Sequence, residues 1–217
     1  MNKRSTVFGA AVAAAALLSF SLPALSDAVE GREYATLSPP QPQETAGKTE
    51  VIEFFSYGCP HCNDLHPLIS KWSAQLPPTV NFVRIPVSMG HPQWGQLVRA
   101  YYTLQATGDL ERLDNALFEA IHKQKQPLYN EANLTAWAAQ NGVDAAKFTA
   151  AFNSFDVSTK SSHAEQLSRS YNVSGIPRMV VAGKYVVLGN NFEQMLANAT
   201  QVVSKAAEGS PGAKARK

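Results

Sequence analysis

The chain has 217 residues, of which 45% are hydrophobic, and its formal net charge is +2. This length and composition are sufficient for a buried core in one domain with an elaboration. The small net charge gives no indication of nucleic-acid binding. The chain contains two cysteines, which excludes a four-cysteine zinc site.

The first 26 residues have the organisation of a secretory signal peptide. Lys3 and Arg4 supply the positive region, an apolar run follows, and the segment that ends at Ser26 is typical of a small-residue cleavage site. We expect cleavage after Ser26 or Ala28, and an uncleaved membrane anchor is the alternative. Removal of the peptide leaves equal numbers of acidic and basic residues.

Two segments with strand character precede the cysteines. Residues 30–37 alternate and predict a short edge strand, after which a proline-rich linker begins at residue 38. Residues 51–56 form a continuous apolar run that contains one acid, Glu53, and such a run is typical of a buried central strand. An acid at a buried position needs a partner or a raised pKa.

This apolar strand leads directly into the motif Cys59-Pro60-His61-Cys62. Apolar residues then recur at helical spacing, which predicts a helix from about Cys59 to Leu76. Cys59 is therefore expected at the helix N-terminus, with Cys62 one turn further along. Unpaired N–H groups and the helix dipole favour negative charge at that position, so the pKa of the Cys59 thiol should be lowered.

A strand, a C-x-x-C pair and a helix, in this order, indicate a thioredoxin-like redox site. A mixed zinc site that also uses His61 or His66 is one alternative. Haem attachment requires a histidine directly after the second cysteine, where this chain has Asn63. A purely structural disulfide is a weak alternative, because a bridge across so short a loop removes little entropy from the unfolded chain. We expect His61 to stabilise the Cys59 thiolate, and a solvent-facing residue without a role is the alternative.

The rest of the chain predicts a strand, a helical block and a second unit with strands and helices. Residues 80–87 alternate as a strand does, and four helical patterns occupy most of residues 88–157. Another helix is expected over 158–171. Two short β-rich runs then flank Ala182-Gly183, which indicates a hairpin, and a last helix is expected over 191–207.

These elements predict an α/β protein, a thioredoxin-like fold with a helical domain inserted between its two halves. The expected parts, in chain order, are the signal peptide (1–26), the first part of the thioredoxin-like domain (27–87), the helical insertion (88–157), the second part of the domain (158–207) and a disordered basic tail (208–217).

Taken together, these features resemble the DsbA family, the exported thiol oxidases of the bacterial periplasm. The resemblance covers nearly the whole mature chain, and its most specific feature is Pro60-His61 between the cysteines. Thioredoxin-like reductases usually have Gly-Pro there, and the disulfide isomerases of the endoplasmic reticulum have Gly-His. The resemblance implies that Cys59 and Cys62 form a disulfide that is donated to other proteins through a mixed disulfide at Cys59.

The resemblance also implies roles for positions outside the motif. Ile176-Pro177 corresponds to the family's cis-proline loop, which packs against the cysteines and leaves the Ile176 backbone available to an extended substrate strand. Without the resemblance, a trans-proline at the start of a strand is the favoured interpretation. Glu53 corresponds to the family's buried acid, and Arg84 replaces the family's lysine. Both a proton relay through Glu53 and a structural Glu53–Arg84 ion pair remain open.

The implied substrates are reduced exported proteins, and a quinone-linked inner-membrane protein of the DsbB type is implied as the partner that restores the disulfide. No metal, nucleotide, flavin or other cofactor is expected, and the expected protein is a periplasmic monomer. The alternatives are a thiol reductase or disulfide isomerase of the same fold, and a peptide-binding or chaperone module whose C-x-x-C is incidental. The sequence leaves open the reduction potential and the role of Arg178, which follows Pro177.

Overall fold

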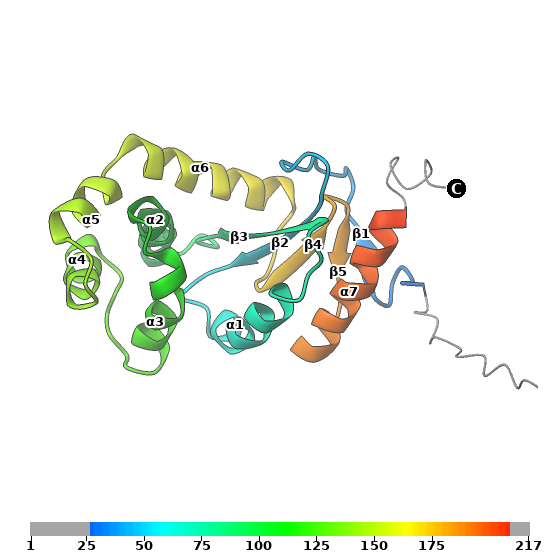
Figure 1. Cartoon of the computed structure of the whole chain (residues 1–217), viewed down its shortest axis with the longest axis horizontal. Helices are drawn as coiled ribbons and strands as arrows, with labels where there is room; N and C mark the ends of the chain where they lie inside the picture. Colours follow the sequence, from blue (N-terminus) through cyan, green and yellow to red (C-terminus); the bar gives the residue numbers. More distant parts are fainter. Residues whose placement is uncertain (1–26, 209–217) are drawn as a thin grey trace, which may run out of the picture.

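The computed structural model describes residues 27–208 (Figure 1). The expected signal peptide and residues 209–217 of the expected tail lie outside the described residues. Glu208 was assigned to the tail by the sequence, but it is the last residue of helix α7 (Phe192–Glu208), because that helix stays packed on the core through the buried Val202 and Val203. In the part of the chain that is described, every helix is too short or too polar to cross a membrane.

A five-stranded sheet forms the centre of the thioredoxin-like half, with the strand order β1-β5-β4-β2-β3. The strand expected over residues 30–37 is the short edge strand β1, and the apolar run before the cysteines becomes β2, which pairs with a neighbour on each side. The strands are β1 (Tyr34–Thr36), β2 (Thr49–Phe55), β3 (Val80–Pro86), β4 (Arg178–Val181) and β5 (Tyr185–Val187).

Strands β2 and β3 are parallel, whereas β4 runs antiparallel to β2. Strands β4 and β5 form the predicted hairpin, in which Ala182 and Gly183 both have positive φ, 53° and 64°. Two successive positive φ angles are the signature of a tight hairpin turn that matches the twist of the strands. Because β2 and β3 are parallel and β4 is antiparallel to β2, the ends of β2 and β3 and the start of β4 meet at one edge of the sheet.

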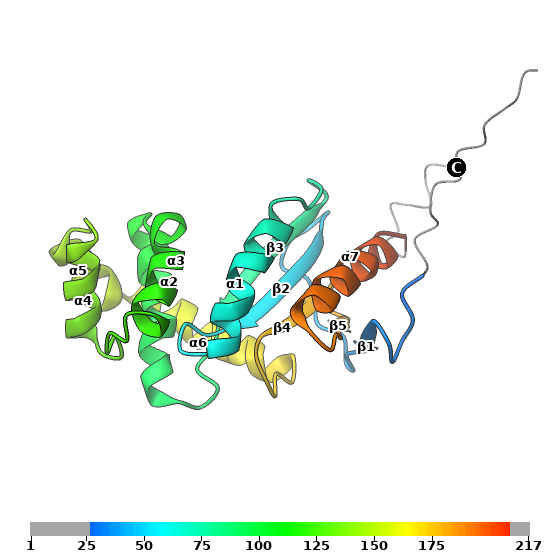
Figure 2. The same ribbon diagram turned by 90° about the horizontal axis from the view of Figure 1, so that it is seen from below.

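Helices cover both faces of this sheet (Figures 1 and 2). On one face, Ile69 of α1 and Val202 of α7 pack in a cluster with Val51 of β2. On the other face, Ala164 of α6 packs in a cluster with Phe54 of β2. The helices are α1 (Pro60–Ser73), α2 (Pro92–Thr107), α3 (Leu110–His122), α4 (Glu131–Gln140), α5 (Ala145–Phe152), α6 (Phe155–Ser170) and α7.

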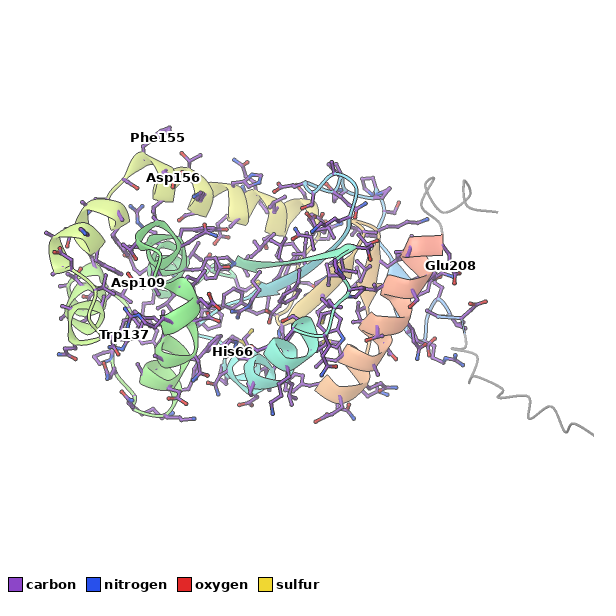
Figure 3. All side chains as sticks on the ribbon, in the orientation of Figure 1. His66, Asp109, Trp137, Phe155, Asp156 and Glu208 are labelled. Carbon is purple, nitrogen blue, oxygen red and sulfur yellow. The ribbon has the colours of Figure 1, made fainter. Side chains whose placement is uncertain are left out.

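The inserted helices α2–α5 lie beyond the edge of the sheet at which β2 ends (Figure 1). Their core includes Leu104, Phe118 and Phe148, and the same cluster contains Cys59 and Cys62. The insertion is therefore packed directly against the C-x-x-C motif. Among the described residues, the exposed large apolar side chains are Val29 and Phe155, and Phe155 projects outward at the start of α6 (Figure 3).

Most helix ends agree with the sequence, and two differ from the prediction. Helix α1 ends at Ser73 instead of Leu76, because the last residues form a turn in which Leu76 N donates to Ser73 O at 3.2 Å. Helix α6 begins at Phe155 instead of residue 158, because Ser154 Oγ accepts a hydrogen bond from Val157 N at 3.2 Å and caps the helix earlier. The boundary expected between 157 and 158 thus falls inside α6.

Candidate active site

Cys59 is the N-cap residue of α1, at the place where the chain leaves β2 and turns into the helix. Its backbone is extended (φ −86°, ψ 120°), and its N–H donates to Ser56 O at 3.1 Å, which closes the turn. Cys62 follows in the first turn of the helix. Both cysteines are free thiols, and they are 5% and 1% exposed, respectively. The predicted position of the pair at the helix N-terminus is confirmed.

The Cys59 thiol has a lowered pKa. The largest contribution is the hydrogen bond from the Cys62 side chain, while partial burial acts in the opposite direction. The backbone N–H groups of Cys62 and His61 contribute next, and the charge of His61 adds to them. Together these groups lower the pKa of Cys59 from 9.0 to about 6. The start of the helix therefore stabilises a thiolate, as the sequence predicts.

Cys62 has the opposite character. Burial raises the pKa of its thiol, and so do its hydrogen bond to Cys59 and the negative charges of Cys59 and Glu53. When both thiols are present, the proton therefore resides on Cys62 and the negative charge on Cys59. Pro60 and His61, which lie between them in sequence, are both exposed to solvent.

The loop before β4 contacts the first cysteine. The peptide bond between Ile176 and Pro177 is cis, as the resemblance predicts, and Cys59 Sγ lies 3.8 Å from the carbonyl oxygen of Ile176. Within residues 27–208, no hydrogen bond to another protein group uses the Ile176 N–H. The side chains of Ile176 and Pro177 are half-buried. The Ile176 backbone thus lies next to Cys59, with an unused donor.

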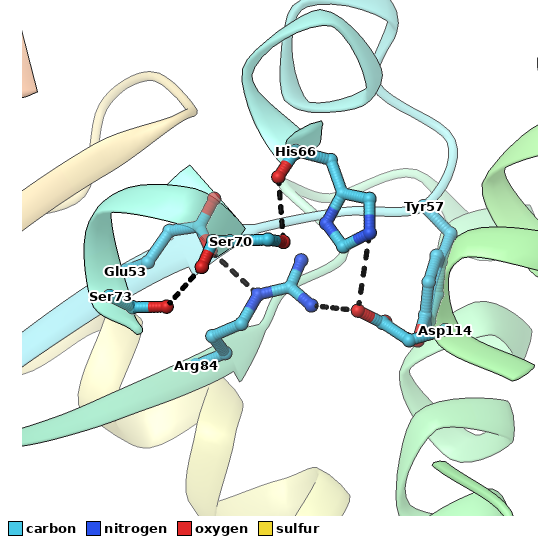
Figure 4. A network of polar contacts seen from close by, with 7 residues as sticks. All are labelled: Glu53, Tyr57, His66, Ser70, Ser73, Arg84 and Asp114. Atoms are coloured by element: carbon cyan, nitrogen blue, oxygen red, sulfur yellow. Dashed lines mark hydrogen bonds and ion pairs between the residues drawn. The ribbon is translucent and has the colours of Figure 1, made fainter. Parts of the chain in front are cut away.

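Behind the cysteines, a polar network connects the sheet to the inserted helices (Figure 4). Glu53 and Arg84 are partners in the register of the parallel strands β2 and β3, and Arg84 Nε donates to Glu53 Oε2 at 2.7 Å. Arg84 Nη1 donates to Asp114 Oδ2 of α3 at 2.5 Å. The hydroxyl of Tyr57 donates to the other oxygen of Asp114, also at 2.5 Å. One arginine thus bridges two carboxylates, one from each part of the protein.

Burial and charge pairing act in opposite directions on the pKa values of Glu53 and Arg84 in this network. Glu53 is fully buried, and desolvation raises its pKa more than Arg84 lowers it. Burial by itself would lower the pKa of Arg84, but Glu53 and Asp114 together raise it, so Arg84 remains charged. Three buried atoms of the network have no hydrogen-bond partner among the described residues: Glu53 Oε1, Arg84 Nη2 and His66 Nδ1. A pocket of about 520 Å³, lined partly by Arg84, Asp114 and His66, borders the network.

The zinc alternative finds no support in the geometry. His66 is 6% exposed, and its Nε2 lies 3.5 Å from Asp114 Oδ2, so His66 belongs to the polar network of Arg84 and Asp114 (Figure 4). Burial lowers the pKa of His66, so this contact is not between two full charges at neutral pH. In the described part of the chain, no group of three or more His, Cys, Asp or Glu side chains is placed to hold a metal ion.

Sequence reasoning missed three side chains of the insertion that contact this site. Asp114 completes the network, His122 Nε2 donates to the carbonyl oxygen of Tyr57 at 2.7 Å, and Trp94 lies directly against Gly58. A signal was available for Asp114, because its position three residues before Leu117 places an acid on the apolar face of its helix. His122 and Trp94 carry no comparable signal, since their partners are backbone groups of a distant segment.

The contact between Gly58 and Trp94 predicts the effect of a small substitution. A Cβ atom at Gly58 would lie 2.3 Å from Trp94 Nε1, so Gly58→Ala should displace the indole and lower the free energy of unfolding by about 1–3 kcal/mol. Gly95 in α2 is a matched control, because a Cβ there meets nothing within 4 Å, and Gly95→Ala should stabilise the helix by up to about 1 kcal/mol. Denaturant unfolding measures both changes. Equal free energies for the two variants would contradict the packing described here.

Strand β2, the C-x-x-C pair at the start of α1 and the cis-proline loop facing it define the class of protein. It is a thiol:disulfide oxidoreductase with a thioredoxin-like fold. A family model, the DSBA-like thioredoxin domain, matches residues 50–201. This chain therefore belongs to the DSBA-like thioredoxin domain family.

Individual relatives support the same assignment. The thiol:disulfide interchange protein DsbA of Bordetella pertussis is 37% identical over 207 residues, which cover 92% of this chain and 97% of that protein. The corresponding protein of Pseudomonas aeruginosa is 40% identical over 182 residues, or 84% of this chain and 85% of that protein. The fold is similar to the crystal structure of Pseudomonas aeruginosa DsbA, with a TM-score of 0.78 and 37% identity over 86% of this chain and 96% of that chain. The oxidoreductase DsbA from Xylella fastidiosa also matches, with a TM-score of 0.78 and 33% identity over 82% and 97% of the two chains.

Proposed function

We propose that this protein is a periplasmic thiol oxidase that donates its Cys59–Cys62 disulfide to newly exported proteins. The observation that carries the proposal is the asymmetry of the two thiols, with the pKa of Cys59 lowered to about 6 and that of Cys62 raised. The groups that stabilise the Cys59 thiolate act only on the reduced form, because the disulfide carries no charge. They therefore favour the reduced protein and make the disulfide a good oxidant.

The reaction transfers two electrons from the substrate to the cysteine pair. A substrate thiolate attacks Cys59 Sγ, the Cys59–Cys62 bond breaks, and Cys62 leaves and takes up a proton. A second substrate thiolate then attacks the substrate sulfur of the mixed disulfide, and Cys59 leaves as a thiolate. The low pKa of Cys59 makes it a good leaving group in this second step. The substrate gains one disulfide, and the enzyme becomes a dithiol.

Glu53 is the proposed proton donor to Cys62 in the first step. Its charge contributes to the raised pKa of Cys62, and burial raises its own pKa, so it holds a proton more readily than an exposed glutamate does. The alternative is a purely structural ion pair with Arg84, for which the 2.7 Å contact is equally suitable. The variant Glu53→Gln distinguishes the proton relay from the structural ion pair. The relay predicts that Cys62 is released more slowly in this variant, without a change in the pKa of Cys59.

Pro60 and His61 are the proposed exposed contact surface of the site. They directly follow Cys59 in α1, and the carbonyl oxygen of Ile176 lies 3.8 Å from Cys59 Sγ. The unused N–H of Ile176 is suited to pair with the backbone of an extended substrate. We expect the protein to act as a monomer without a cofactor. A DsbB-type inner-membrane protein linked to quinones would restore the disulfide. The expected signal peptide would direct the chain to the periplasm.

The test is oxidative refolding of a reduced protein that contains several cysteines. The disulfide form of this protein is supplied in stoichiometric amount, with no other oxidant. We expect one substrate disulfide for each enzyme molecule consumed. A reductase or isomerase of the same fold is the competing function, and it predicts little net oxidation together with efficient reduction of substrate disulfides by the dithiol form. That result would overturn the proposal.

A further inference from the structure

Arg178 lies at the active-site edge of the sheet, directly after the cis-proline. Ile176, two residues earlier, faces the Cys59 sulfur at 3.8 Å through its carbonyl oxygen. Side chains of a strand alternate between its faces. Met179 packs on the face covered by α1 and α7, and Val180 packs on the face covered by α6. Arg178 therefore points to the α6 face, next to the segment on which the proposed substrate would lie.

The charge of Arg178 has no partner within residues 27–208. In the part of the chain that the structure describes, no hydrogen bond or ion pair involves its guanidinium, and its buried Nε has no acceptor there. Burial lowers the pKa of Arg178, and no nearby carboxylate opposes that effect. The other two arginines with a buried unpaired nitrogen differ, since Arg84 binds two carboxylates and Arg99 donates to the carbonyl of Phe152.

An unpaired, half-buried cation is unfavourable inside a folded protein. Such a group is explained if its counter-ion comes from another molecule, and the planar guanidinium is suited to bind both oxygens of a carboxylate. In an extended peptide, successive residues are about 3.3 Å apart. A substrate residue up to two positions from the attacking cysteine would therefore cover the same span as Ile176 to Arg178.

We propose that Arg178 is a specificity-determining residue that binds an aspartate or glutamate side chain located within two residues of the substrate cysteine that attacks Cys59. The inference rests on the proposed oxidase function. It defines a class of preferred substrates, namely reduced cysteines with an acidic neighbour, and it assigns the guanidinium a role in binding that is separate from the transfer of the disulfide.

The test uses dithiol peptides that differ at one position, with Glu or Gln placed in turn at each position up to two residues before or after the attacking cysteine. A nearby charge also changes the thiolate fraction of the peptide itself. The measured quantity is therefore the Glu-to-Gln ratio of second-order oxidation rates in the wild type, divided by the same ratio in Arg178→Gln. We expect a value of about 3 to 10 at one position, which decreases with added salt. Arg178→Glu should reverse the preference.

Lys184→Gln is the matched control, because it removes one positive charge from an exposed residue of the hairpin at the other end of β4. It should keep the wild-type ratio. If the Glu-to-Gln ratio of the wild type equals that of both Arg178 variants at every position, while the Gln peptides are still oxidised, the role of Arg178 is overturned. If the wild type oxidises neither the Glu peptides nor the Gln peptides, the proposed oxidase function is overturned as well. The salt dependence of the wild-type ratio tests the charge contact even where an Arg178 variant fails to fold.

Discussion

Cys59→Ser should lower disulfide transfer to a reduced substrate protein to the uncatalysed background, a loss on the order of 10³-fold or more. The substituted side chain cannot form the bond to Cys62 that the substrate attacks, nor can it leave as a stabilised thiolate. The refolding assay measures the effect directly. A variant that retained transfer would show that the C-x-x-C pair is incidental, as a peptide-binding or chaperone module would require.

Cys62→Ser provides the matched control for this prediction. It also abolishes net oxidation, but it leaves Cys59 with the backbone N–H groups of the helix start that stabilise its thiolate. Its Cys59 thiolate can attack a substrate disulfide and release one substrate thiolate, and we expect the resulting mixed disulfide to accumulate, because no second thiol of the enzyme is present to release Cys59. Cys59→Ser should form no such adduct, since the remaining thiol at Cys62 is 1% exposed and has a raised pKa.

Arg84→Ala should lower the free energy of unfolding by about 3–5 kcal/mol. The substitution leaves Glu53 fully buried without a counter-ion and removes one of the contacts that hold Asp114. It also removes the guanidinium from the face of Phe55, where it lies 3.9 Å from the ring centroid. Denaturant unfolding of the dithiol form measures the loss.

Two further variants test the reason for that loss. Lys123→Ala breaks an exposed ion pair with Glu119 and should change the stability by no more than about 0.5 kcal/mol. The double variant Glu53→Gln/Arg84→Met removes both charges of the buried pair. It should be more stable than Arg84→Ala, because the penalty arises mainly from the unpaired buried charge. A double variant as unstable as the sum of its single changes would contradict this explanation.

The features that the sequence predicts correctly depend on neighbouring residues. Cys59 caps α1 because a strand and an amphipathic helix meet there, and Ala182-Gly183 forms the turn of the hairpin between β4 and β5. Such local rules require no knowledge of how distant elements pack.

The features that the sequence could not predict depend on contacts between distant segments. Arg84 was placed opposite Glu53 only through the resemblance, because the register of two parallel strands is not evident from either strand alone. Asp114 and His122 come from α3, and they reach the active-site turn only because the inserted helices pack on the end of β2. The same contacts explain why the insertion is part of the site, since it supplies the second carboxylate to Arg84 and holds the Tyr57 carbonyl.

The stabilised thiolate links the structure to the proposed chemistry. Because the folded protein lowers the pKa of Cys59 below its value in the unfolded chain, its contribution to the stability of the dithiol form is complete above about pH 9 and is lost as the pH falls through about 6. The disulfide form has no such group. The difference in stability between the two forms should therefore shift toward the dithiol form as the pH rises between these values.

The most direct measurement is the rate of iodoacetamide alkylation of Cys59 in the dithiol form as a function of pH. Cys62 does not interfere in this range, because it is buried and its pKa is raised. We expect a half-maximal rate near pH 6, the pKa that Cys59 acquires from Cys62, the helix N–H groups and His61. A midpoint near 9, the ordinary value for a cysteine thiol, would contradict it.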